Sequence, residues 1–250
     1  MTTQATPTAP MNVLVVGLGV IGTTYGYLFQ KAGHHVEHLV RQSSTRASVS
    51  SLEVEILDGR RDPKGSLSQD QYTVHHRGHT SYDLIVVSVP QGRIAEVMAD
   101  LRTNGIEGPV LLFCGFWGER EELDRLMAGR DVLLGYPVAG GSITGERLTC
   151  CVFDHVMLER RDKARFPGYE RVEALFGSCG ISLEGPMTCS SGSGCIWRST
   201  PVSVPWQQCT ATSRTRRAPP SSSWALPGCS PGWSRRSGKH RGSWPRAALI

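Results

Sequence analysis

The sequence predicts an α/β fold: a doubly wound parallel sheet covered by helices on both faces and followed by an irregular C-terminal tail. Apolar, strand-like segments alternate with helix-periodic segments over residues 11–186, and short Gly-rich connections join them. Near Pro186 the composition changes abruptly. With 250 residues, 39% of them hydrophobic, the chain is long enough to bury a sizeable core.

Each expected element rests on a local pattern. The runs NVLVV, LIVV and VLLF are continuously apolar, which is typical of strands buried on both faces of a parallel sheet. The segments between them carry apolar residues at helical spacing. In chain order we expect strand 12–16, helix 20–32, strand 36–40, strand 84–89, helix 93–101, strand 110–114, helix 119–127, strand 132–134, strand 150–158 and helix 169–179.

The C-terminal tail differs from the rest of the chain in charge and composition. All 22 acidic and 18 of the 27 basic residues lie before Met187, so this part has a net charge of −4. The nine basic residues after Met187 give the tail a net charge of +9. Five of the six Trp and four of the eight Cys also lie there, without helical or strand periodicity. Codons permitted from Met187 onward, read one nucleotide later, can encode an apolar, helix-periodic string. We therefore expect residues 187–250 to be a disordered, frameshift-like tail.

The chain's N-terminal end and its apolar runs bear on targeting. Residues 1–10 carry neither a basic nor an apolar signal region, and we expect them to be disordered. The longest apolar runs fall far short of the roughly 20 residues that span a bilayer. The sequence predicts a cytoplasmic protein without a membrane segment, and it specifies no oligomeric state.

A glycine motif predicts the function of the first domain. Gly17, Leu18, Gly19, Val20, Ile21 and Gly22 form G-x-G-x-x-G directly after an apolar strand and at the start of a helix. In such a βαβ unit the first glycine permits a tight turn, the second lets the backbone approach a pyrophosphate, and the third allows close helix–strand packing. Residues 11–186 are therefore expected to be a Rossmann-type dinucleotide-binding domain.

The end of the second strand predicts which dinucleotide binds. An acidic residue there would bond the ribose 2′-hydroxyl of NAD. The chain instead has Arg41, whose guanidinium suits the 2′-phosphate of NADP(H), although Arg41 as a solvated loop charge is the alternative.

These residues resemble the ketopantoate reductase (2-dehydropantoate 2-reductase) family. Further matching segments are 82–89 (YDLIVVSV), the strand VLLF followed by Gly118 and an acidic helix, and 135–141 (GYPVAGG). The resemblance covers about residues 11–186. It implies reduction of ketopantoate to pantoate with NADPH, in pantothenate biosynthesis.

The resemblance also implies site residues and a second domain. Val89 and Pro90, at the end of the strand expected over 84–89, would contact the cofactor, although this chain has Pro90 where the family usually has a Lys after its fourth strand. Gly115 stands where the family has an Asn. The family's helical second domain carries a catalytic Lys and a substrate-binding Glu, and its place is taken here by the tail, so the sequence assigns no catalytic residue.

Other clusters are expected to be structural. His75, His76 and His79 are expected in a loop, without metal. Cys114, Cys150, Cys151 and Cys179 are expected to be buried, reduced thiols. Glu119, Glu121 and Glu122 suit the first turn of a helix. Arg and Trp in the tail could contact nucleic acid, but no nucleic-acid-binding motif supports that partner.

Two function classes remain open. One is an NADPH-dependent reductase acting on 2-dehydropantoate or a related small 2-keto acid or ketone, impaired by a frameshift. The other is a nucleotide-binding protein without catalysis. The second domain discriminates between them, because a dinucleotide-binding domain does not itself supply the general acid and substrate walls.

Overall fold

The computed structural model describes residues 9–116, 118–190 and 193–196, so the expectations for residues 1–8 and for the tail from 197 onward lie outside the described residues. A main sheet has the strand order β12-β11-β10-β7-β6-β5-β1-β2. Its strands are β1 (Asn12–Val16), β2 (His35–Leu39), β5 (Leu84–Val87), β6 (Val110–Phe113), β7 (Val132–Tyr136), β10 (His155–Glu159), β11 (Ser182–Ser190) and β12 (Ser193–Ile196).

The five strands from β2 to β7 are parallel, as the sequence predicts, and β10 joins β7 antiparallel. After β1 and β2 the chain returns on the other side of β1 to form β5. In a doubly wound sheet such a reversal leaves a crevice at the carboxyl ends of the two diverging strands.

Helices cover both faces of the main sheet. Alternate residues of each strand point to opposite sides, and so build two buried clusters. Helices α1 (Val20–Lys31) and α4 (Tyr169–Ser178) pack on one face, and α2 (Ile94–Thr103) and α3 (Arg120–Met127) pack on the other. A 3₁₀ turn, η1 (Gln91–Arg93), precedes α2. No helix among the described residues is long and apolar enough to cross a bilayer.

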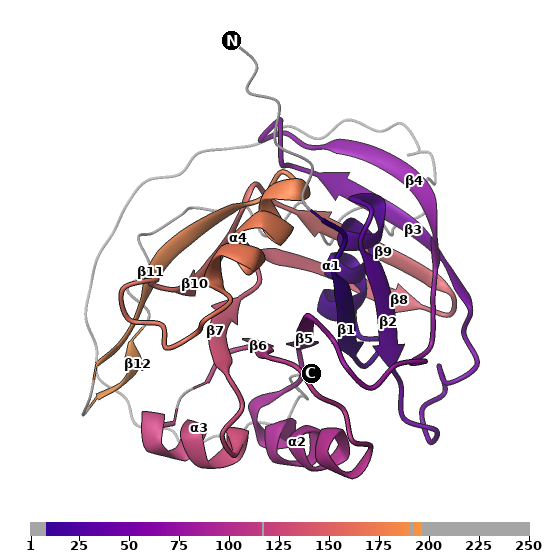
Figure 1. Ribbon diagram of the computed structural model, residues 1–250. Helices are drawn as coiled ribbons and strands as arrows, with labels where there is room; N and C mark the ends of the chain where they lie inside the picture. Colours follow the sequence, from indigo (N-terminus) through magenta and orange to yellow (C-terminus); the bar gives the residue numbers. More distant parts are fainter. Residues whose placement is uncertain (1–8, 117, 191–192, 197–250) are drawn as a thin grey trace, which may run out of the picture. The chain divides into compact units, whose positions relative to one another are not determined.

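A second, four-stranded sheet was not predicted. Its order is β4-β3-β9-β8, formed by β3 (Ser51–Asp58), β4 (Ser66–Thr73), β8 (Ala139–Thr144) and β9 (Arg147–Val152). Its buried side chains join those of α1 in one cluster, so α1 lies between the two sheets (Figure 1). This sheet makes α1 a nearly all-round buried helix.

Two expectations about strands near the end of the described chain differ from the structure. The single strand expected over 150–158 is two strands, β9 and β10, interrupted at Phe153 and Asp154. The break occurs because β9 pairs with β3 in the second sheet whereas β10 pairs with β7 in the main sheet. β11 extends through Pro186 to Ser190, across the position where the composition changes.

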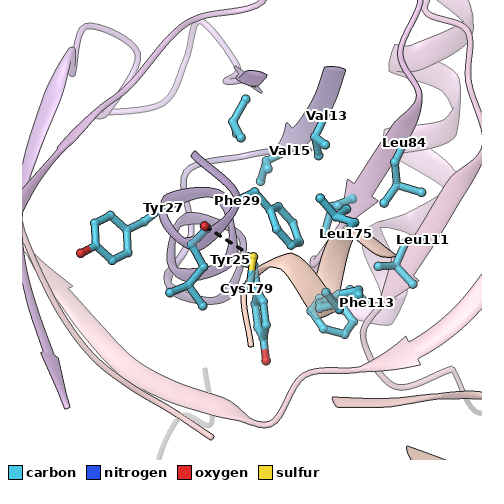
Figure 2. Close-up of a cluster of buried hydrophobic side chains, with 14 of the residues drawn as sticks. Val13, Val15, Tyr25, Tyr27, Phe29, Leu84, Leu111, Phe113, Leu175 and Cys179 are labelled. Atoms are coloured by element: carbon cyan, nitrogen blue, oxygen red, sulfur yellow. Dashed lines mark hydrogen bonds between the residues drawn. The ribbon is translucent and has the colours of Figure 1, made fainter. Parts of the chain in front are cut away.

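Aromatic packing fixes α1 against the main sheet. The ring of Tyr25 meets that of Phe113 edge-on, with centroids 4.8 Å apart, and Phe29 contacts Phe176 of α4 at 5.4 Å. Figure 2 shows Phe29 and Tyr27 on opposite sides of the helix, and the Cys179 thiol donating to a carbonyl oxygen of α1. Such edge-to-face pairs contribute about 0.5–1.5 kcal/mol each beyond the area they bury. They hold the middle and C-terminal half of α1 against β6 and α4.

Candidate functional site

A groove of about 290 Å³ lies where the main sheet's topology predicts a crevice. Three chain segments at the carboxyl ends of strands meet there: Val16–Gly19 at the end of β1, Leu39–Arg41 at the end of β2, and Ser88–Pro90 just after β5. The other lining residues come from the loop after β2 and from η1 and α2: Ser44, Arg46, Arg93, Glu96, Val97 and Asp100.

The glycine loop adopts the conformation that the motif predicts. Gly17 has a φ of +88°, which an L side chain rarely adopts, and its N–H donates to the Leu39 carbonyl oxygen at 2.8 Å. Gly19 is the N-cap of α1, and its carbonyl oxygen accepts the first helical hydrogen bond, from the N–H of Thr23. A Cβ on Gly17 or Gly19 would meet no protein atom within 4 Å. The backbone of the loop is therefore open to a ligand.

Gly22 fills the third role of the motif. A Cβ built on it would lie 2.7 Å from Cγ1 of Val15 and 2.9 Å from Oγ of Ser88, closer than real Cβ atoms come. Only glycine lets α1 pack this closely on β1 and β5. The close packing in turn places Gly19, the N-cap of α1, at the groove, where free amide N–H groups and the helix dipole favour an anion.

Two arginines share one carboxylate at the groove. Nη1 of Arg41 is 2.9 Å from Oε1 of Glu96. Arg93 makes a bidentate pair with the same carboxylate, with Nη2 2.8 Å from Oε1 and Nε 3.1 Å from Oε2. The hydrogen bonds from Arg93 hold the pKa of Glu96 below its usual value. All three side chains are 41–52% exposed, so a more strongly charged anion can compete for the guanidinium groups.

A third arginine connects the loop to the second sheet. Nη1 of Arg46 donates to the Leu18 carbonyl oxygen at 3.1 Å, and Nη2 reaches the carbonyl oxygen of Ile143 in β8 at 3.4 Å. Arg46 is partly buried and lines the groove. The groove thus carries three guanidinium groups, Arg41, Arg46 and Arg93, against the carboxylates of Glu96 and Asp100.

The structure brings most of the predicted site residues together. Gly17, Leu18, Gly19, Arg41, Val89 and Pro90 all line the groove. Val20, Ile21 and Gly22 do not. Val20 and Ile21 lie in the first turn of α1 and pack on the core, and Gly22 is buried against β1.

Arg46, Arg93 and Glu96 were not predicted from the sequence. The signal available for Arg93 and Glu96 was their i, i+3 spacing at the start of the helical segment after β5. Arg46 gave no signal, because its partners lie 28 and 97 residues away.

The other candidates lie outside the groove. His76 and His79 are in the loop between β4 and β5, and Nδ1 of His79 lies 2.6 Å from Oε1 of Glu37, an acidic neighbour that the sequence did not predict. Among the described residues, no group of three or more potential ligands is arranged to hold a metal ion. Cys150, Cys151 and Cys179 are buried, as predicted, whereas Cys114 is only partly buried.

The acidic cluster before the fifth parallel strand behaves as predicted. Glu119 is the N-cap of α3, and Glu121 and Glu122 lie in its first turn. Negative side chains there stabilise the positive end of the helix dipole. These carboxylates therefore stabilise α3.

Comparisons with known proteins agree with this architecture. The family model described as ketopantoate reductase PanE/ApbA matches residues 13–149. No curated protein sequence matches the chain.

Three solved structures illustrate the similarity of fold. A PanE/ApbA family ketopantoate reductase from Ralstonia eutropha JMP134 is 16% identical, with a TM-score of 0.52, over 70% of this chain and 56% of its own. A 2-dehydropantoate 2-reductase from Methylococcus capsulatus is 19% identical, with a TM-score of 0.50, over 68% of this chain and 55% of its own. D-mandelate dehydrogenase, solved with NADH and anilino(oxo)acetate, is 12% identical, with a TM-score of 0.55, over 70% of this chain and 56% of its own. The chain thus spans less than two thirds of each of these proteins.

Proposed function

The chain belongs to the ketopantoate reductase PanE/ApbA family, and on that premise we propose that its groove binds NADPH, the cofactor of a reductase for 2-dehydropantoate or a related 2-keto acid. The observation that carries this proposal is the groove at the carboxyl ends of β1, β2 and β5, with an open glycine loop and three arginines among its lining residues. A dinucleotide's phosphates and ribose need such a combination.

The residues present fit a phosphorylated dinucleotide. The Gly17–Gly19 backbone and the first turn of α1 would receive the pyrophosphate, because a Cβ on either glycine would project into open space. Arg41 and Arg93 would bind the 2′-phosphate, since two guanidinium groups already converge on one anion, Glu96. Bound NADPH supplies a hydride; the chain's contribution is to hold and orient it.

The described lining residues of the groove include no evident proton donor for the reduction. The ionisable side chains among them are three arginines and two carboxylates, and an arginine is a poor acid because its guanidinium group keeps its proton in proteins. A positioned general acid contributes about 10²- to 10⁴-fold to such a reaction. We therefore propose that the chain binds the nucleotide but turns over little, the reading frame having changed near Met187. Nucleotide binding without any catalysis is the second candidate, favoured by the same lack of a donor among the described lining residues.

A binding experiment tests the nucleotide assignment. Fluorescence titration of the full chain should give tighter binding of NADPH than of NADH. Arg41→Ala should weaken NADPH binding about tenfold, the effect of losing one charge-assisted hydrogen bond, and leave NADH unchanged. Arg147→Ala is the matched control, because Arg147 is 56% exposed and pairs with Glu53 in the second sheet, away from the groove. Equal affinities for the two dinucleotides would refute the assignment of Arg41.

An activity experiment separates the two candidate functions. NADPH consumption is followed with 2-dehydropantoate and a panel of 2-keto acids, for this chain and for one whose reading frame is restored after Pro186. We expect turnover only from the restored chain. Robust turnover by the chain as it stands would overturn the frameshift proposal, and inactivity of both would favour nucleotide binding alone. A cytoplasmic location and a place in pantothenate biosynthesis belong to the same proposal.

A further inference from the structure

We propose that His38 is a positioning residue that aims the Leu18 amide N–H into the nucleotide groove. This inference rests on the proposed function, because it assigns a role to one donor of the pyrophosphate site. His38 lies in β2, beneath the glycine loop, and was not among the sequence-predicted site residues.

Both ring nitrogens of His38 have partners. Nδ1 is 2.8 Å from the carbonyl oxygen of Gly17, and Nε2 is 2.7 Å from the hydroxyl of Tyr72 in β4. His38 is 1% exposed and Tyr72 is fully buried. The histidine therefore links the second sheet to the glycine loop through two hydrogen bonds: the one to Tyr72 is buried and the one to Gly17 is partly buried.

The partners determine where the proton of the ring lies. A carbonyl oxygen only accepts hydrogen bonds, so the proton is on Nδ1 and is donated to Gly17. Nε2 must then accept from the Tyr72 hydroxyl. Burial lowers the pKa of His38 to about 4, so the ring is neutral near pH 7, with its one donor and one acceptor both used.

The hydrogen bond to Gly17 fixes the orientation of a whole peptide unit. The Gly17–Leu18 peptide is trans, so its C=O and N–H point in opposite directions. Because His38 draws the carbonyl oxygen toward the interior, the Leu18 N–H points away from the interior. Gly17 and Leu18 both line the groove, so this N–H faces the space assigned to the pyrophosphate. Gly17 has a positive φ and no side chain to restrain it, which makes an external restraint on this peptide effective.

A glycine in α1 leaves room for the hydrogen-bonded rings of His38 and Tyr72. A Cβ on Gly26 would lie 2.8 Å from Oη of Tyr72 and 3.4 Å from Nε2 of His38. Glycine in a helix interior is about 1 kcal/mol less favourable than alanine. Gly26 thus allows the two polar rings to approach the helix.

Ligands with and without a pyrophosphate test the proposal on the full chain. In His38→Leu the donor to Gly17 is lost, and we expect NADPH to bind about tenfold more weakly, the effect of one charge-assisted hydrogen bond. Adenosine 2′-monophosphate, which has no pyrophosphate, should bind as it does to the wild type, as measured by its displacement of NADPH. General damage to the fold would weaken both ligands alike.

His34→Leu is the matched control. His34 is also buried, at 5% exposure, and also uses both ring nitrogens, with the N–H of Met11 and the hydroxyl of Ser178. It does not line the groove. His34→Leu should therefore leave the ratio of the two affinities unchanged.

A rescue variant completes the test. In His38→Asn combined with Tyr72→Phe, the carboxamide can still donate to Gly17 and no hydroxyl is left unpaired, so NADPH affinity should return toward that of the wild type. If His38→Leu does not fold, His38→Met, whose flexible side chain fills irregular space, takes its place. Equal loss of both ligands, or no loss of NADPH, overturns the role of His38. A wild type that fails to bind NADPH overturns the proposed function as well.

Discussion

Replacing Gly22 by alanine tests whether close helix–strand packing at the glycine loop is needed for stability. Gly22 is the third residue of α1 and is buried against β1. The added methyl group would lie 2.7 Å from Cγ1 of Val15, a β-branched side chain of β1 that is fully buried. Neither the strand nor the stiff valine side chain can move aside without disturbing the core.

Two opposing terms set the change in the free energy of unfolding expected for Gly22→Ala. Alanine is about 1 kcal/mol better than glycine in a helix. Overpacking a well-packed core costs about 1–3 kcal/mol. Gly177→Ala measures the first term alone, because Gly177 is an exposed helical glycine of α4 whose added Cβ would meet nothing within 4 Å, so comparing the two variants isolates the overpacking cost. Gly177→Ala should stabilise the protein, and Gly22→Ala should be about 1–3 kcal/mol less stable than Gly177→Ala.

Urea and thermal denaturation of the two variants provide the assay. A difference of 1–3 kcal/mol corresponds to a separation of about 2–12 °C in Tm for a domain of this size. Equal m-values would show that the denatured states are comparable. If Gly22→Ala proved as stable as Gly177→Ala, the reasoning that the motif's third glycine is required by packing would be refuted.

Three further substitutions probe the charges and the backbone. Glu96→Gln removes the carboxylate that competes for Arg41, and should raise NADPH affinity up to about fivefold without changing NADH affinity; an unchanged or weaker NADPH affinity would contradict the competition. Hydrogen bonds from Arg60 lower the pKa of Asp58, so this pair stabilises the fold above about pH 4 and its contribution is lost as the pH falls through the lowered pKa. Asp58→Asn should therefore cost about 1–2 kcal/mol at pH 7, with urea curves converging on those of the wild type as the pH falls through the lowered pKa of Asp58. Ala128 has a φ of +51° at the end of α3, so Ala128→Gly should gain about 1 kcal/mol, and a loss of stability would count against strain there.

The strands missed by sequence reasoning show where local patterns lose information. β4 (SLSQDQYT) is polar and largely exposed, and it is a strand because its backbone pairs with β3 along eight residues. β8 (AGGSIT) contains two glycines and pairs with β9. β3 did carry a usable signal, since Leu52, Val54 and Ile56 alternate with exposed or half-buried residues.

The sequence by itself determined the parallel sheet and the glycine loop. Both are local: an apolar run forms a buried strand, and three glycines at fixed spacing permit one turn between a strand and a helix. The meeting of these segments at the groove follows as well, because Gly17, Arg41 and Pro90 come within three residues of the carboxyl ends of β1, β2 and β5. Expected positions for β1, α1, α3 and α4 agree with the structure within one residue at each end.

Only the tertiary structure decided which side chains act on the loop and on the arginines. His38 meets Gly17 and Tyr72, and Arg41 meets Glu96, across 21, 34 and 55 residues of sequence. A histidine in a strand gives no local sign of the carbonyl it will reach, because that contact exists only after two sheets have packed on one helix. Contacts between residues far apart in sequence depend on the whole chain's packing, whereas strands and turns depend on neighbouring residues.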